Sequence, residues 1–171
     1  MPGALLTEIR DVHDAQLLTA LREQSSRKIL YRTPLVKIPG IVASAAFADG
    51  DAVGVKFNIG VPTSGTITTT LLSDLDDEGL SLAFILFDDD FDGGTDNSAF
   101  DMTDANELKY CGFLTVSNFQ ALNDNQLGQS STVLDYVAPT GRLWVQAVAR
   151  GAVNIGVSTD YGISLILEDH S

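Results

Sequence analysis

Residues 142–150 read RLWVQAVAR, and the alternation within this segment decides the fold that the sequence predicts. Leu143, Val145 and Ala147 would share one side of the segment, with Trp144, Gln146 and Val148 on the other. A repeat of two residues is the period of a β-strand, because successive side chains point to opposite faces. The segment therefore predicts a strand rather than a helix.

Segments of similar character recur from residue 41 onward, rich in β-branched and apolar residues and bounded by Gly, Asp, Asn or Pro. They are IVASAAF (41–47), AVGVKFNI (52–59), GTITTTLLSD (65–74), LSLAFILF (80–87), CGFLTV (111–116), STVLDYV (131–137), VNIGVS (153–158) and YGISLILE (161–168). Short strands at this spacing are typical of an antiparallel β-sandwich. We expect an all-β, jelly-roll-like sandwich, because a jelly roll has eight strands.

Three stretches between these segments carry other signals. In DMTDANELKY (101–110), Asp104 at an N-cap with Glu107 three residues later predicts one short helix over about 104–110. NFQALNDNQLGQSS (118–131) is polar and rich in turn residues, and it predicts a long surface loop. SDLDDEG (73–79) predicts a solvent-exposed acidic turn.

The first 40 residues differ from the rest of the chain. Apolar residues between 5 and 30 are spaced by three and four, which is the pattern of a helical stripe. Pro34 and Pro39-Gly40 then favour an extended backbone. We therefore divide the chain into an N-terminal extended and helical arm, residues 1–40, and a β-sandwich domain, residues 41–171.

Charge is distributed unevenly between these two parts. The net charge is −13, yet residues 1–37 hold six of the ten basic residues and only four of the 23 acidic ones. So acidic a body repels phosphate, and we expect no nucleic-acid partner. The basic arm is expected to dock on an acidic partner, although an ordinary solvated surface is the alternative. The candidate partner-binding residues of the arm are Arg10, Arg22, Arg27, Lys28, Ile29, Leu30, Tyr31, Arg32, Leu35, Val36 and Lys37.

Neither a membrane span nor an enzyme is predicted. The sequence holds no run of 18 or more apolar residues, and its acidic start is not that of a signal peptide, so we expect a cytoplasmic product. The histidines, His13 and His170, lie near the two ends of the sequence, which leaves Cys111 and the serines without an evident base. Cys111 is interpreted as a buried structural residue, and we expect no catalytic site.

One acidic stretch resembles the start of a calcium loop. FDDDFDGGTDNSAFD (87–101) places Asp88, Asp90, Asp92 and Asp96 at positions 1, 3, 5 and 9 of such a loop. Position 12, which needs a bidentate glutamate, is Ala99, and a strand rather than a helix precedes the stretch. A calcium site completed by another carboxylate and a hydrophilic hairpin tip therefore stay as alternatives, and no other cofactor is expected.

Two longer runs resemble a known group of proteins. GTITTTLLSDLDDEGLSLAFILFDDD (65–90), followed by TDNSAFDMTDANELKYCGFLTV (95–116), resembles virion structural proteins of tailed double-stranded DNA bacteriophages, and the pair RLWVQAVAR and YGISLILED is similar to their final strands. The resemblance covers about residues 50–170. Its motifs are structural and carry no catalytic residue over.

This resemblance implies a cement or decoration protein on the capsid surface of a virion, made in the host cytoplasm. Its partners would be the major capsid protein and further copies of itself, as a dimer or trimer, with no membrane partner. A receptor- or carbohydrate-binding module of a phage fibre or tail, built on the same sandwich, is the alternative function.

Overall fold

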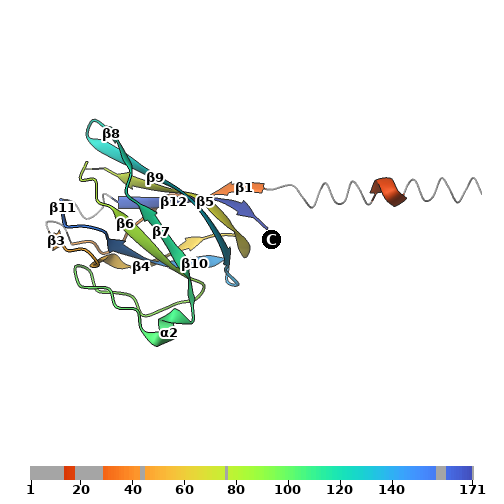
Figure 1. Cartoon of the computed structure of the whole chain (residues 1–171), viewed down its shortest axis with the longest axis horizontal. Helices are drawn as coiled ribbons and strands as arrows, with labels where there is room; N and C mark the ends of the chain where they lie inside the picture. The colour runs from red at the N-terminus through yellow and green to blue at the C-terminus, as the bar shows by residue number, and fades with distance from the viewer. Residues whose placement is uncertain (1–13, 18–28, 43–44, 76, 157–160, 171) are drawn as a thin grey trace, which may run out of the picture.

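The computed structural model describes residues 14–17, 29–42, 45–75, 77–156 and 161–170. Most of these residues lie in antiparallel strands that form two facing sheets and one small strand pair (Figure 1). The all-β antiparallel sandwich predicted from the sequence is therefore confirmed, whereas its jelly-roll version stays a prediction.

The larger sheet contains β1 (Ile29–Arg32), β2 (Val36–Lys37), β5 (Ser64–Asp74), β8 (Phe119–Leu122), β9 (Asn125–Val137) and β12 (Tyr161–Asp169). Hydrogen bonds join them in the order β1-β12-β5-β9-β8, and β2 pairs with β12 on the same edge as β1. The centre of this sheet is thus formed by strands that lie far apart in the sequence.

The smaller sheet contains β4 (Ala52–Gly60), β6 (Leu82–Phe87), β7 (Tyr110–Val116) and β10 (Arg142–Ala149), in the order β4-β10-β6-β7. A separate pair joins β3 (Ala45–Phe47) to β11 (Val153–Ile155). Of the strand predicted over 41–47, residues 45–47 form β3, residues 41 and 42 are not in a strand, and residues 43 and 44 lie outside the described residues.

The main core lies between the two sheets. Leu143, Val145 and Ala147 of β10 are fully buried there, as their alternation predicts, against residues such as Ile163 and Leu165 of β12. Full burial of such an aliphatic side chain contributes about 1.5–3 kcal/mol each. The paired inner faces therefore supply most of the apolar burial that stabilises the sandwich.

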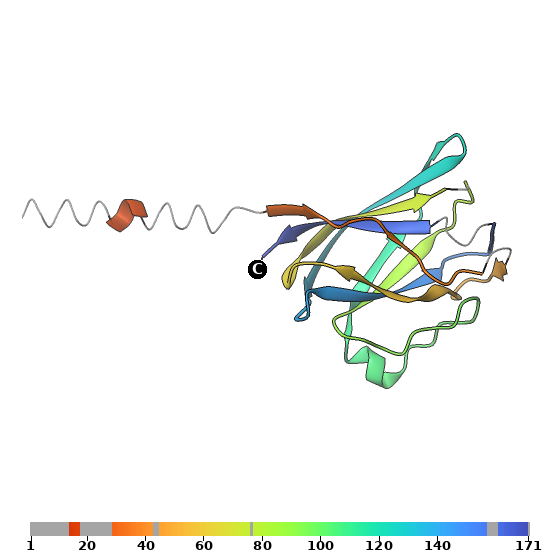
Figure 2. The same cartoon turned by 180° about the vertical axis from the view of Figure 1, so that it is seen from behind.

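The outer face of the smaller sheet is also covered. Residues 88–109, which include helix α2 (Asp104–Glu107), fold over it, as Figures 1 and 2 show. Phe91 of this segment is buried against Phe87, with ring centres 3.9 Å apart, and it shares a second apolar cluster with Val148. We call residues 88–109 the covering segment.

The short helix starts at residue 104 as predicted, but its N-cap is one residue earlier than expected and it ends before the predicted position of about 110. The N-cap is Thr103, whose side chain accepts a hydrogen bond from Asn106 N, and the helix ends at Glu107. Asp104 is therefore the first helical residue, where its charge favours the N-terminal end of the helix dipole. The predicted capping pair of Asp104 and Glu107 was wrong by one position.

The long loop predicted for residues 118–131 is instead a hairpin. β8 and β9 are joined by Asn123 and Asp124, and Leu122 pairs directly with Asn125. Asn123 has φ 66°, and a positive φ at this position is typical of two-residue hairpin turns. Asparagine tolerates that conformation better than most residues, which makes it a suitable first turn residue here.

Residues 29–42, expected to lie mostly in the arm, are part of the sandwich up to Ile41. β1 and β2 extend the larger sheet, and Ile38 is 1% exposed within the main core. The carbonyl of Pro39 accepts a hydrogen bond from Val55 N at 2.8 Å, close above Gly54. A Cβ atom on Gly54 would lie 2.3 Å from that carbonyl oxygen, so only glycine allows this crossing of β4.

Candidate functional site

The predicted partner-binding residues fall into two groups. Arg10, Arg22, Arg27 and Lys28 lie outside the described residues. The other seven lie along one edge of the larger sheet: Ile29, Leu30, Tyr31 and Arg32 in β1, Leu35 between the strands, and Val36 and Lys37 in β2. Leu30 is 69% exposed, so the first strand of the sandwich presents apolar surface to solvent.

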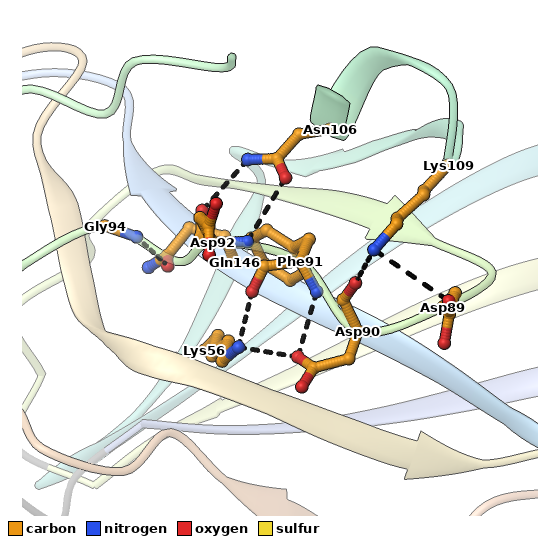
Figure 3. A network of polar contacts seen from close by, with 9 residues as sticks. All are labelled: Lys56, Asp89, Asp90, Phe91, Asp92, Gly94, Asn106, Lys109 and Gln146. Atoms are coloured by element: carbon orange, nitrogen blue, oxygen red, sulfur yellow. Dashed lines mark hydrogen bonds and ion pairs between the residues drawn. The ribbon is translucent and has the colours of Figure 1, made fainter. Parts of the chain in front are cut away.

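The acidic stretch is fixed to the smaller sheet by a lysine from β4. Lys56 Nζ donates to Asp90 Oδ1 at 2.6 Å and to the Phe91 carbonyl oxygen (Figure 3). The same ammonium group lies 5.6 Å from the ring centre of Phe91 and 5.5 Å from that of Trp144. The hydrogen bond from Lys56 holds the pKa of Asp90 below its ordinary value.

Two further contacts fix the middle of the covering segment. Asn106 of α2 accepts from Asp92 N at 3.2 Å and donates to the Asp92 carbonyl at 3.0 Å, while its side chain is buried (Figure 3). Gln146 Oε1 of β10 accepts from Gly94 N at 3.0 Å. Gln146 is a buried polar residue of β10, and this bond is one reason why it is tolerated there.

Asp96 belongs to a different set of contacts. Its two carboxylate oxygens accept from Gly54 N at 2.6 Å and from Val42 N at 3.0 Å, so it joins β4 to the segment that crosses it. Asp88 donates its backbone N–H to the Lys109 carbonyl at 3.0 Å. The carboxylates of Asp90 and Asp96, two of the four predicted calcium ligands, are therefore used in separate places rather than around one point.

The same conclusion holds for metal sites more widely in the described part of the chain. No three Asp, Glu, His or Cys side chains there are grouped in a way that could hold a metal ion. At Asp90 and Asp96, the oxygens that calcium would need already accept hydrogen bonds from the protein. The stretch is not a free hairpin tip either, because Phe91 packs on the smaller sheet and the carboxylates of Asp90 and Asp96 are stabilised by Lys56 and by backbone N–H groups.

The turn after β5 was expected to be solvent-exposed, but its first acidic residue is fully buried. Asp74 Oδ2 accepts from Gly79 N at 2.8 Å, and the Tyr161 hydroxyl lies 3.5 Å from it. Tyr161 also donates to Glu78 Oε2 at 3.2 Å. Burial and these two carboxylates raise the pKa of Tyr161, which keeps its hydroxyl protonated as a donor.

Cys111 is half-buried rather than fully buried. Its thiol lies 3.7 Å from the Lys109 carbonyl, and burial, with the charge of Asp88, raises the pKa of Cys111 to about 11. A thiol with so high a pKa is almost wholly protonated at neutral pH, when it is a poor nucleophile. This agrees with the structural role predicted for it.

A groove lies on the outer face of the larger sheet, a place to which no sequence motif pointed. Its volume is about 780 Å³, within the range of small-ligand sites. Two of the predicted partner-binding residues, Arg32 and Leu35, form part of its wall, and no acidic side chain among the described residues lines it. The lining residues are Arg32, Leu35, Leu71, Leu72, Ser73, Asn118, Phe119, Gln120, Leu127, Gly128, Gln129, Ser131 and Ser164.

Strand register explains how these residues come together. Ser164 of β12 pairs with Leu71 of β5, which pairs with Gln129 of β9, so the three side chains form one row across the sheet. Ser73 and Leu127 form part of the next row. The groove thus joins residues from positions 32 to 164, and only the register of the strands brings them together.

The groove could not be recognised from the sequence by any of the usual signals. Its polar residues are serine, asparagine and glutamine, which occur in turns and on surfaces throughout the chain. The one available clue was the alternation of residues 127–133, where Leu127, Gln129 and Ser131 fall on one face. That alternation was interpreted partly as a loop, and the sheet that it joins was not known.

Comparison of this chain with known protein families, with curated proteins and with solved structures finds no match. Within the described residues, no helix has the length and apolar character needed to cross a bilayer.

Proposed function

We propose that this chain is a structural protein of the virion of a tailed double-stranded DNA bacteriophage, a cement or decoration protein on the capsid surface. It would bind across neighbouring major capsid subunits and stabilise the shell by adding buried surface. The resemblance of residues 50–170 to such proteins supports this function, as does a rigid sandwich whose acidic body would keep decorated particles apart.

The observation that carries the proposal is strand β1. Its four residues are all exposed on an outer edge of the larger sheet, and Ile29 and Leu30 are 62% and 69% exposed. An exposed apolar edge strand favours pairing with another chain. Residues 1–37, which include β1, hold six basic and four acidic residues, a net charge of +2 against −15 for the rest of the chain, which suits a segment that reaches an acidic neighbouring subunit.

The proposal is tested by co-sedimentation with shells of the major capsid protein from the same genome. We expect the full chain to sediment with the shells, and a chain lacking residues 1–28 or carrying Ile29→Asp and Leu30→Asp to stay in the supernatant. The matched control is Val133→Asp, an 82% exposed position elsewhere on the same sheet, which should still bind. Undiminished binding by both altered chains, or no binding by the full chain, would contradict the proposal.

A second candidate function is favoured by the groove. An open concavity with hydroxyl and amide side chains is suited to a saccharide, as expected of a receptor- or carbohydrate-binding module of a fibre or tail. Electron microscopy of purified particles separates the two functions, because a cement protein would occupy the shell and a fibre module the tail.

A further inference from the structure

Arg32 is an unusual cation in this acidic chain. Among the described residues it lies in no ion pair, although the chain has a net charge of −13. Its Nε donates to Ser164 Oγ at 3.3 Å, and Ser164, which is fully buried, donates to the Thr33 carbonyl at 2.8 Å. The guanidinium is therefore held in place through one nitrogen, while its two terminal nitrogens stay available at the groove.

The surface next to Arg32 is polar but carries no opposing charge. The row from Ser164 through Leu71 ends at Gln129, and Ser131 and Ser73 lie in the neighbouring rows. Each serine hydroxyl or glutamine amide both donates and accepts hydrogen bonds. Leu71 and Leu127 add apolar surface between these groups, as small-ligand sites usually have.

We propose that this groove binds an oligosaccharide that carries a carboxylate, such as one with a sialic or uronic acid. The Arg32 guanidinium would hold the carboxylate through two parallel hydrogen bonds, the geometry that arginine favours. Ser73, Gln129 and Ser131 would bind the sugar hydroxyls, which also both donate and accept. The inference concerns the groove alone and holds whether or not the chain decorates a shell.

An acidic peptide is the other ligand with this charge, and the groove fits it less well. Extended peptides are usually bound by the unpaired backbone of an edge strand. The floor of this groove is instead the outer face of β5 and β9, two interior strands whose backbone groups already pair within the sheet. Side chains, rather than backbone groups, supply the polar contacts there, which suits a polyhydroxylated ligand.

The test is binding of the full chain to an array of sialic- and uronic-acid oligosaccharides, printed beside the same sugars with the carboxyl reduced to an alcohol. We expect binding to the acidic sugars. The reduced sugars should bind with an affinity at least about tenfold lower, because a hydrogen-bonded charge is lost. Arg32→Gln should lower the affinity about tenfold or more. Arg32→Lys should have an affinity between those of the wild type and Arg32→Gln, because lysine keeps the charge but cannot donate two parallel hydrogen bonds.

Controls separate loss of the site from loss of the fold. Arg142→Gln removes an exposed arginine from β10, in the other sheet, and should bind like the wild type. Gln129→Ala should weaken sugar binding several-fold and leave the thermal melt unchanged, because its side chain is exposed. In heteronuclear NMR spectra, the bound sugar should shift the amides of Ser73, Gln129 and Ser131.

Three outcomes would overturn the proposal. They are the absence of binding to any acidic oligosaccharide on the array, full binding by a folded Arg32→Gln chain, and preference for a hexaglutamate peptide over every acidic sugar. The last would assign the groove to an acidic peptide partner. Failure of shell binding has no effect on this result, so the two proposals can fail separately.

Discussion

The outer faces of the two sheets differ in what covers them. On the smaller sheet, residues 88–109 bury the outer face, and Phe91 and Asn106 of that segment are 3% and 2% exposed. On the larger sheet, the outer face carries an open groove of about 780 Å³. The segment over the covered face holds four carboxylates within residues 88–92, whereas no acidic side chain among the described residues lines the open groove.

The contrast between the two faces shows that a high density of charged residues does not by itself make a binding site. The carboxylates of Asp90 and Asp96 accept hydrogen bonds from Lys56 and from backbone N–H groups. Their charges therefore stabilise contacts within the chain and are not directed at a ligand. The groove instead presents Arg32 without a carboxylate partner among the described residues. A region whose charged groups are paired within the chain is a structural element. A region that positions a charged side chain without an ion-pair partner can recognise a ligand.

The largest expected effect comes from breaking the apolar contact that holds the covering segment. Phe91→Ala should lower the free energy of unfolding by about 3–5 kcal/mol, because it removes a buried ring stacked on Phe87 and leaves a cavity. Leu127→Ala on the open face is the matched change and should cost about 1 kcal/mol or less. Urea denaturation of both variants measures the difference, and equal losses would contradict the contrast between the faces.

A smaller effect is expected at Asp90 and depends on pH. Because its pKa is lowered in the folded chain, this carboxyl stabilises the fold above the ordinary value of about 3.8, and the contribution is lost as the pH falls through the lower folded pKa. Wild type should therefore have a higher denaturation midpoint than Asp90→Asn at pH 7, and the gap should close near about pH 2.

Lys56→Met provides the control for this pH effect. Since the hydrogen bond from Lys56 is the largest cause of the lowered pKa, Asp90→Asn should have much less effect on the midpoint in that background. A gap that keeps its size in the Lys56→Met chain would show that the lysine is not responsible.

The smallest expected effect is that of calcium. Thermal melts with excess calcium and with a chelator should agree within about 1 °C, because a bound ion at 100 times its dissociation constant would add about 2.7 kcal/mol to stability. A rise of several degrees with calcium, abolished by Asp90→Asn or Asp96→Asn, would restore the metal site and make the covering segment a ligand-binding region after all.

The strands were the most predictable part of the molecule. The alternation of Leu143, Val145 and Ala147 correctly placed these residues in the core, and the segments starting at residues 52, 65, 111 and 161 lie within a residue of the observed strand starts. Period-two patterns are local, and the burial of one face imposes them directly on the sequence. The short helix that starts at residue 104 was also predicted, with an error of one residue at its cap and of about three residues at its end.

The errors occurred where distant segments decide the outcome. Trp144 and Val148 were on the face opposite the core, yet Val148 is buried because residues 91–102 pack over it. Ile38 was assigned to the arm, but pairing of β1 and β2 with β12 draws it into the core. The hairpin of β8 and β9 was missed because its outward positions are polar, although the Asn123-Asp124 pair was a usable turn signal.

The sequence by itself determined that the chain forms an all-β sandwich, where most strands lie, and that 19 of the 23 acidic residues follow residue 37. These properties follow from side-chain period and residue type, which act over a few neighbouring residues. Only the tertiary structure decided that Lys56 neutralises Asp90 and that Arg32, Ser164, Gln129 and Ser73 share one groove. The groove depends on the register of strands that are distant in sequence, because pairing fixes which side chains stand together on a sheet. The contact of Lys56 with Asp90 depends on how the covering segment packs on the smaller sheet.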